Sequence, residues 1–143
     1  MRGRRLVVFS SLISLAIGLA GCGNSALPRT YPASGMVVYQ DGKPIKGGGS
    51  IQFVSADDPS LRISGEIKPN GSFVLRTVRD NEQAPGAPVG EFEVTIQPKL
   101  AVDPRGAELG AHRVADPIVL ERKQKVHAGE NQMKIEIPMP PSS

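Results

Sequence analysis

Residues 62–78 read RISGEIKPNGSFVLRTV, and this stretch decides the fold class. On either side of Pro69-Asn70-Gly71, apolar residues alternate with polar ones, which is the two-residue period of a half-buried β-strand. Asn-Gly between two such runs is the strongest short-range signal of a hairpin. The stretch therefore predicts two antiparallel strands, at 62–68 and 72–78.

The same alternation extends outward from this hairpin in both directions, whereas no segment after residue 21 keeps the 3.6-residue period of a helix. We expect further strands at 34–40, 50–55, 91–97, 118–126 and 132–137, joined by turns rich in Gly, Asn, Asp and Pro. Strands with one apolar face each must pair as two sheets, so the predicted fold is all-β, a seven-stranded β-sandwich. The residues expected in its core are Val37, Tyr39, Ile51, Phe53, Ile63, Phe73, Leu75, Phe92, Val94, Ile96, Met133 and Ile135.

The N-terminus differs in composition from the rest of the chain. Arg2, Arg4 and Arg5 precede a charge-free apolar run at 6–19. A helix needs about 20 apolar residues to cross a bilayer. The run is too short for that and has the length of the apolar region of a secretory signal. It ends in Leu19-Ala20-Gly21-Cys22, which resembles the lipobox of bacterial lipoproteins.

The lipobox resemblance implies a lipid anchor. The signal peptidase of that family would recognise Leu19, Ala20 and Gly21 and cut before Cys22, whose thiol carries a diacylglycerol. Two alternatives remain open: an ordinary secretory signal with Cys22 as a free thiol, and an uncleaved short membrane helix. The expected organisation is a signal peptide at 1–21, the lipidated Cys and a linker at 22–30, the β-sandwich at 31–137 and a disordered tail at 138–143.

Charge and cysteine content exclude several classes of protein. Arg2, Arg4 and Arg5 are three of the 17 basic residues and residues 1–21 hold no acid, so the remaining chain has 14 basic and 14 acidic residues. A neutral body without a basic stripe argues against nucleic acid as a partner. The single Cys excludes an internal disulfide framework and a cysteine-rich zinc site.

The order of motifs in the body resembles a known family. The runs at 34–45, 49–53, 65–73, 85–96 and 126–137 are similar, in this order, to the strands of carboxypeptidase regulatory-like and transthyretin-like domains. The resemblance covers about residues 31–137 and implies a prealbumin-like or immunoglobulin-like sandwich. In carboxypeptidases such domains are non-catalytic accessories, and the small lipoproteins of this kind have no assigned reaction.

Candidate catalytic residues are few. The hydroxyisourate hydrolases of the transthyretin-like fold carry a C-terminal Tyr-Arg-Gly-Ser-type signature, but this chain ends in Met139-Pro-Pro-Ser-Ser143. The two histidines, His112 and His127, fall in an irregular connection and beside a turn, where we expect exposed side chains. No Gly-x-Ser-x-Gly elbow is present, and Cys22 is assigned to the lipid, so a nucleophilic triad is not expected.

Four other features have simpler explanations than a binding site. Asp57-Asp58 lacks the rest of a calcium loop and reads as a turn. Gly47-Gly48-Gly49 precedes a strand, not the helix of a phosphate-binding loop. Asn70-Gly71-Ser72 fits the glycosylation sequon but also the hairpin turn. The basic residues of 122–125 read as an edge strand whose charges resist aggregation.

These observations favour a lipid-anchored, non-catalytic module of the cell envelope, facing the periplasm or the exterior from the inner or outer membrane. No cofactor and no metal are expected. The expected partner is an envelope protein or a cell-wall polysaccharide, with loops 79–90 and 98–116 and the edge strands as contact surfaces. The alternative is a carbohydrate- or small-ligand-binding lipoprotein, for which Tyr31 is the aromatic residue expected to be free. A hydrolase is the third and disfavoured hypothesis.

Overall fold

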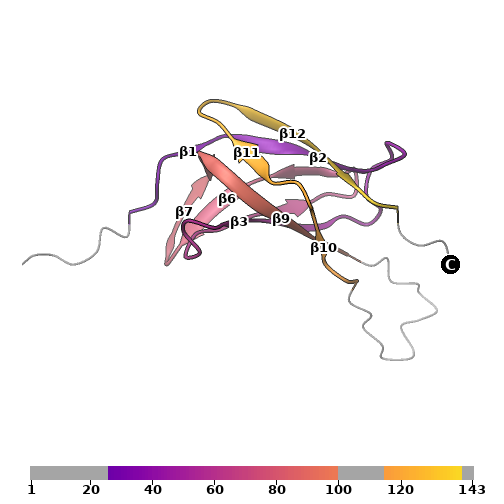
Figure 1. Cartoon of the computed structure of the whole chain (residues 1–143), viewed down its shortest axis with the longest axis horizontal. Coiled ribbons are helices and arrows are strands. Elements are labelled where there is room, and N and C mark those ends of the chain that lie inside the picture. Colours follow the sequence, from indigo (N-terminus) through magenta and orange to yellow (C-terminus); the bar gives the residue numbers. More distant parts are fainter. Residues whose placement is uncertain (1–25, 100–114, 140–143) are drawn as a thin grey trace, which may run out of the picture.

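The computed structural model describes residues 26–99 and 115–139, and these residues form β-strands and no helix (Figure 1). None of them belongs to a helix that is long and apolar enough to span a membrane. The strands are β1 (Thr30–Tyr31), β2 (Ala33–Tyr39), β3 (Gly49–Ser55), β4 (Arg62–Ile67), β5 (Ser72–Val74), β6 (Arg76–Arg79), β7 (Glu82–Pro85), β8 (Ala87–Pro88), β9 (Gly90–Pro98), β10 (Ile118–Val119), β11 (Gln124–Val126) and β12 (Asn131–Ile137). The all-β prediction is confirmed.

Ten of these strands form one curled, mixed sheet with two halves. One half has the order β9-β3-β4-β6-β7, with β10 and β11 both paired to the free side of β9; the other has the order β5-β2-β12. The halves join where Ile67 of β4 pairs with Phe73 of β5. β12 runs parallel to β2. In Figure 1, β2 and β12 lie above β3 and β9, which is the layered arrangement of a sandwich-like fold.

The core lies between the two halves. Ten of the predicted core residues are buried, whereas Tyr39 and Met133 are half-buried and pack against its edge. Phe53 and Phe92 meet with ring centroids 6.0 Å apart in a tilted arrangement. Further buried apolar residues are Ala33, Val38, Ile45, Leu61, Ile67, Ala87, Val126 and Ile137.

The hairpin predicted from Asn-Gly is present. The Lys68 N–H donates a 2.9 Å hydrogen bond to the Ser72 carbonyl oxygen. The Asn70 side-chain oxygen accepts from the Ser72 N–H at 3.0 Å and from its hydroxyl at 2.7 Å. Gly71 has a φ of 85°, which only glycine adopts at little cost. Gly71 thus allows the backbone to reverse, and the Asn70 side chain holds Ser72 in the turn.

Two strands predicted as continuous are interrupted. The run 72–78 divides at Leu75, whose N–H donates to the Ala33 carbonyl oxygen at 2.9 Å and whose carbonyl oxygen accepts from the Gly86 N–H at 2.8 Å. Leu75 is therefore the residue at which the chain crosses from one half of the sheet to the other.

The run 118–126 divides into β10 and β11, and both pair with β9. Ile118 and Val119 pair with Ile96 and Thr95, whereas Gln124 pairs with Phe92. Residues 120–123 therefore lie opposite only residues 93 and 94, which shifts the register by two. Such an extra loop on an edge strand is a bulge.

Three short strands were not predicted. β1 falls at the start of the expected body, and β7 and β8 fall in the segment 79–90 that was expected to be a loop. β7 has no buried side chain and β8 has only two residues, so neither carries an alternating pattern. Their pairing comes from the tertiary fold.

Candidate functional site

The predicted lipidation site is not part of the described structure. Cys22, with Leu19, Ala20 and Gly21, lies outside the described residues, as does the whole predicted signal peptide at 1–21. His112 and residues 140–143 of the predicted tail lie outside them too.

The N-terminal segment lies on the domain from the first described residue. The Ala26 carbonyl oxygen accepts a 3.2 Å hydrogen bond from the Arg79 guanidinium. Leu27 and Pro28 are half-buried. β1 then pairs with β8, with Tyr31 opposite Ala87. The described part of the predicted linker, residues 26–30, is therefore in contact with the sandwich.

Asp58 fixes the Arg79 side chain that holds this segment. The Asp58 carboxylate forms an ion pair with the Arg79 guanidinium, whose side chain is only 16% exposed. The same carboxylate accepts from the Ser60 hydroxyl at 2.6 Å and from the Ser60 N–H at 3.2 Å. The Ser60 hydroxyl bond is the main cause that lowers the pKa of Asp58, with Arg79 contributing and partial desolvation opposing. The Asp58 carboxylate therefore stays ionised and holds the Arg79 guanidinium in place; this pair is called the Arg79–Asp58 clamp below.

The acidic pair Asp57-Asp58 takes part in a turn. The Ser55 hydroxyl oxygen accepts hydrogen bonds from the Asp57 N–H and the Asp58 N–H, each 3.2 Å long. Within residues 26–99 and 115–139, no three His, Cys, Asp or Glu side chains are grouped so as to hold a metal ion.

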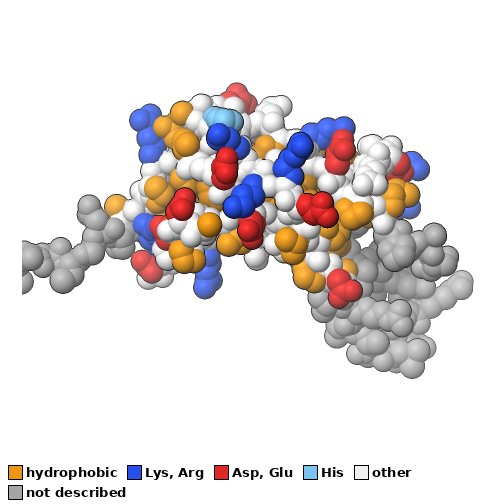
Figure 2. Space-filling view, in the orientation of Figure 1, with side chains coloured by type: hydrophobic (Ala, Val, Ile, Leu, Met, Phe, Trp, Pro, Cys, Tyr) orange, Lys and Arg blue, Asp and Glu red, His pale blue; other side chains and the backbone are white. Residues whose placement is uncertain are grey.

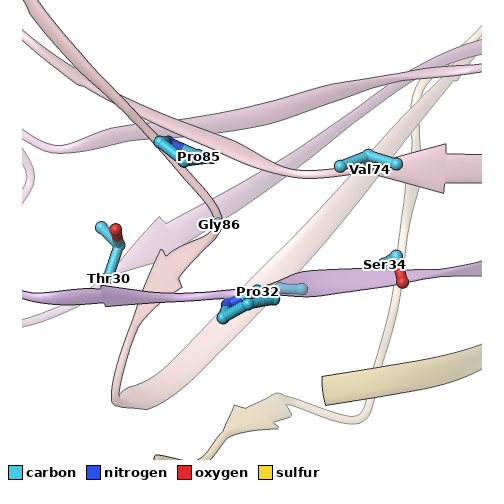
Figure 3. Close-up of a pocket in the computed structure, with 7 residues that line it drawn as sticks. Thr30, Pro32, Ser34, Val74, Pro85 and Gly86 are labelled. Carbon is cyan, nitrogen blue, oxygen red and sulfur yellow. The ribbon is translucent and has the colours of Figure 1, made fainter. Parts of the chain in front are cut away.

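A groove of about 330 Å³ lies where the N-terminal segment meets the sandwich (Figure 3). Thr30, Pro32 and Ser34 form one side, and Val74 and Pro85 lie across from them. Ala33 and Gly86 complete the lining. These seven residues include no titratable side chain. The lining is mainly apolar, so the groove can hold an apolar group or a ring.

The Tyr31 side chain is less exposed than the sequence predicts. Its side chain belongs to the half-buried β1 residue that pairs with Ala87. The Arg29 guanidinium lies 5.4 Å from the centre of the Tyr31 ring, in cation–π distance. One face of the ring is therefore covered by this chain's own arginine.

His127 lies next to a turn that the Asn131 side chain holds together; this turn, residues 127–131, is called the Asn131 corner below. His127 is exposed, and its backbone N–H donates to the Asn131 side-chain oxygen at 2.9 Å. The Asn131 side-chain NH₂ donates to the carbonyl oxygens of His127 at 2.9 Å, Gly129 at 3.0 Å and Pro32 at 3.3 Å. Asn131 falls in the connection between the predicted strands 118–126 and 132–137, and its role was not predicted because a buried Asn has no pattern of its own.

Of the predicted basic edge at 122–125, only Lys125 lies on β11, and Arg122 and Lys123 precede that strand. Lys125 pairs with Glu91 of β9 in the ladder, and their side chains, both more than half exposed, approach to 3.8 Å. The far side of β11 has no strand partner among the described residues. Basic and acidic side chains are interspersed over the face seen in Figure 2.

The glycine run leads into β3 and not into a helix. Gly48 has a φ of 73°, and a Cβ atom there would collide with the Ile67 carbonyl oxygen. Its own carbonyl oxygen accepts from the Lys99 N–H at 3.0 Å. Because Gly48 has no side chain, the chain segments around Gly48, Ile67 and Lys99 can lie in direct contact.

The described fold defines the class of this protein as all-β, with a sandwich-like core and a docked N-terminal segment. No family model, no curated protein and no solved structure matches the chain.

Proposed function

We propose that this chain is a lipid-anchored, non-catalytic module of the bacterial cell envelope. Cys22 holds it in the inner or outer membrane, and its domain faces the periplasm or the exterior. One observation carries the proposal: a basic start and an apolar run end at Leu19-Ala20-Gly21, directly before the single Cys of the chain. Two or three acyl chains on one Cys give stable membrane attachment, whereas one chain gives only marginal binding.

The finer fold we propose is the seven-stranded prealbumin-like sandwich of transthyretin-like and carboxypeptidase regulatory-like domains. The number of strands supports this fold. β5 and β6 count as one interrupted strand, and β10 and β11 count as another. The principal strands are then β2, β3, β4, β5/β6, β9, β10/β11 and β12. β1, β7 and β8 are short additions. Domains of this kind bind or support partners, so an envelope protein or a cell-wall polysaccharide is the proposed partner class.

Metabolic labelling tests the anchor in cells. Bacteria that express the full chain are fed an alkyne-bearing fatty acid, and the membrane fraction is examined for labelled protein. We expect label on the natural chain and none on Cys22→Ala, which has no thiol to carry the lipid. Label that persists in Cys22→Ala, or a natural chain without label, would overturn the proposal.

A carbohydrate- or small-ligand-binding lipoprotein is the second candidate. The groove beside β1 favours it, because its volume of about 330 Å³ falls at the lower end of ligand-pocket sizes, about 300–1,000 Å³. A glycan array probed with residues 23–143 and with the variants Tyr31→Ala and Val74→Asp tests it. Binding that both variants lose would place this function ahead of the partner-binding one.

A further inference from the structure

The N-terminal segment is fixed to the domain before the sandwich begins. Arg79 donates to the Ala26 carbonyl oxygen, and the same guanidinium is held by Asp58 of the β3–β4 connection. Leu27 and Pro28 are half-buried, and β1 is paired with β8. From Ala26 onward the position of this segment is therefore set by the fold.

The distance from Cys22 to this fixed point is short. Four Cα–Cα steps separate Cys22 from Ala26, and an extended chain spans at most about 3.6 Å per residue. The Ala26 Cα atom therefore lies within about 14 Å of the Cys22 Cα atom. A lipid on Cys22 holds that residue at the head-group level of the bilayer.

We propose that the bilayer head groups face the end of the domain that carries Ala26, the Asp58–Arg79 ion pair and the turn between β6 and β7. This inference rests on the proposed function, because it needs the lipid on Cys22. The β1 strand and the β6–β7 turn lie at one end of the molecule in Figure 1, and the loop that follows β2 lies at the other. A strand advances about 3.3 Å per residue, so Ala33 and Tyr39, the two ends of β2, are separated by about 20 Å. The turn at 41–43 therefore points away from the membrane.

The short connection, and not charge, sets this orientation. The membrane-facing end carries both signs of charge: acidic Asp58, Asp80 and Glu82, and basic Arg29, Arg62 and Arg79. Such a mixture gives little net attraction to anionic lipids. The orientation should therefore persist when salt screens exposed charges beyond a few ångströms.

Site-specific fluorescence quenching tests the orientation. Asn81→Cys places a reporter at the membrane-facing turn, and Lys43→Cys places one at the opposite end; both side chains are exposed. Each full-length variant is purified from membranes, labelled with a small thiol-reactive fluorophore and reconstituted in vesicles of phosphatidylethanolamine and phosphatidylglycerol. A phosphatidylcholine with a nitroxide on its head group is the quencher.

The number of labels per chain separates the two proposals. One label shows that the Cys22 thiol is blocked, whereas two labels show that it is free, which overturns the anchor and the orientation with it. With one label, we expect quenching severalfold stronger at position 81 than at position 43, at low and at high salt. Equal quenching at both positions, or stronger quenching at position 43, overturns the orientation alone.

A lengthened connection is the matched control. Inserting about 16 Gly and Ser residues after Ser25 raises the root-mean-square reach of the connection to about 24 Å. The described contacts of Ala26 are untouched by this change. We expect the difference between positions 81 and 43 to shrink severalfold, and a difference that stays unchanged would contradict a role for the short connection.

Discussion

Gly86 allows β1 to lie against the sandwich. It has a φ of 86°, and a Cβ atom there would collide with the backbone oxygen of Tyr31. Gly42 has a similar φ of 82° but open space around it. A left-handed conformation costs a non-glycine residue about 1–2 kcal/mol. We expect Gly42→Ala to cost about that much and Gly86→Ala clearly more, because β1 must also move away from β8.

Urea unfolding of residues 23–143 measures both changes. The difference between the two variants isolates the backbone collision, since the conformational cost is common to them. Equal losses of unfolding free energy would show that Tyr31 does not approach Gly86 as described.

Asn131 links the end of β11 to the N-terminal segment through its side chain. It is 7% exposed and makes four side-chain hydrogen bonds, three of them to carbonyl oxygens. Each such bond contributes about 1 kcal/mol net. We therefore expect Asn131→Ala to lower the free energy of unfolding by about 3 kcal/mol. The exposed neighbour substitution Gln132→Ala should change it little, and similar losses in both would refute the corner.

The pKa of the Asp58 carboxyl should lie below its ordinary value of 3.8, because the Ser60 hydroxyl, then the Ser60 N–H and then Arg79 favour its ionised form. A carboxyl with a lowered folded-state pKa stabilises the fold above its unfolded pKa of about 3.9. That stability is lost as the pH falls through the lower folded-state pKa. Carboxyl-carbon NMR titration measures the pKa directly. Ser60→Ala should raise the pKa of Asp58 and leave Asp41 as it was; an unchanged Asp58 would contradict the described hydrogen bonds.

At the scale of the elements, β12 is an edge strand that pairs only with β2 among residues 26–99 and 115–139. The Asn131 N–H donates to Pro32 at 2.9 Å, and the Ile137 carbonyl oxygen accepts from Gln40 at 3.1 Å. In a parallel ladder, alternate residues direct both backbone groups to the same neighbour. The amides of residues 131, 133, 135 and 137 therefore face β2, and those of 132, 134 and 136 face the open side.

Amide hydrogen exchange followed by NMR should show this alternation. We expect slow exchange at Met133, Ile135 and Ile137, and faster exchange at Gln132, Lys134 and Glu136. Uniform protection along the strand would mean that another chain or segment covers this edge.

The sequence predicts those elements whose side chains alternate over five residues or more. β3, β4, β9 and β12 fall within one or two residues of their predicted bounds because one face of each contacts the core. The break at Leu75 was not predictable, since Phe73 and Leu75 are both buried and the alternation continues through the crossing. β7 and β8 hold too few buried residues to produce a pattern. Their position is decided by partners that are remote in the sequence.

The same limit applies to the candidate site. Residues 19–22 can be compared with a lipobox from the sequence alone, because that motif is one linear segment. The groove, the Arg79–Asp58 clamp and the Asn131 corner each combine residues from separate strands, for example Ala26 with Arg79. No local pattern joins such pairs, so only the folded chain brings them together.

At the scale of the whole molecule, we propose that a lipid on Cys22 is followed closely by a domain whose N-terminal segment is docked from Ala26. In this proposal the connection is short, so the lipid on Cys22 sets both the location of the domain and the surface that remains open to partners. If Cys22 carried no lipid, the docked segment would be a structural feature only. Secreted roles, including binding of a small ligand in the groove, would then come first.

The intact mass of the membrane-extracted protein, measured beside that of Cys22→Ala, tests this claim most directly. We predict a chain that begins at Cys22 and is heavier by a diacylglycerol, with or without a further acyl chain, and a variant that lacks this addition. A natural chain with an unmodified mass and a free thiol at Cys22 would contradict it.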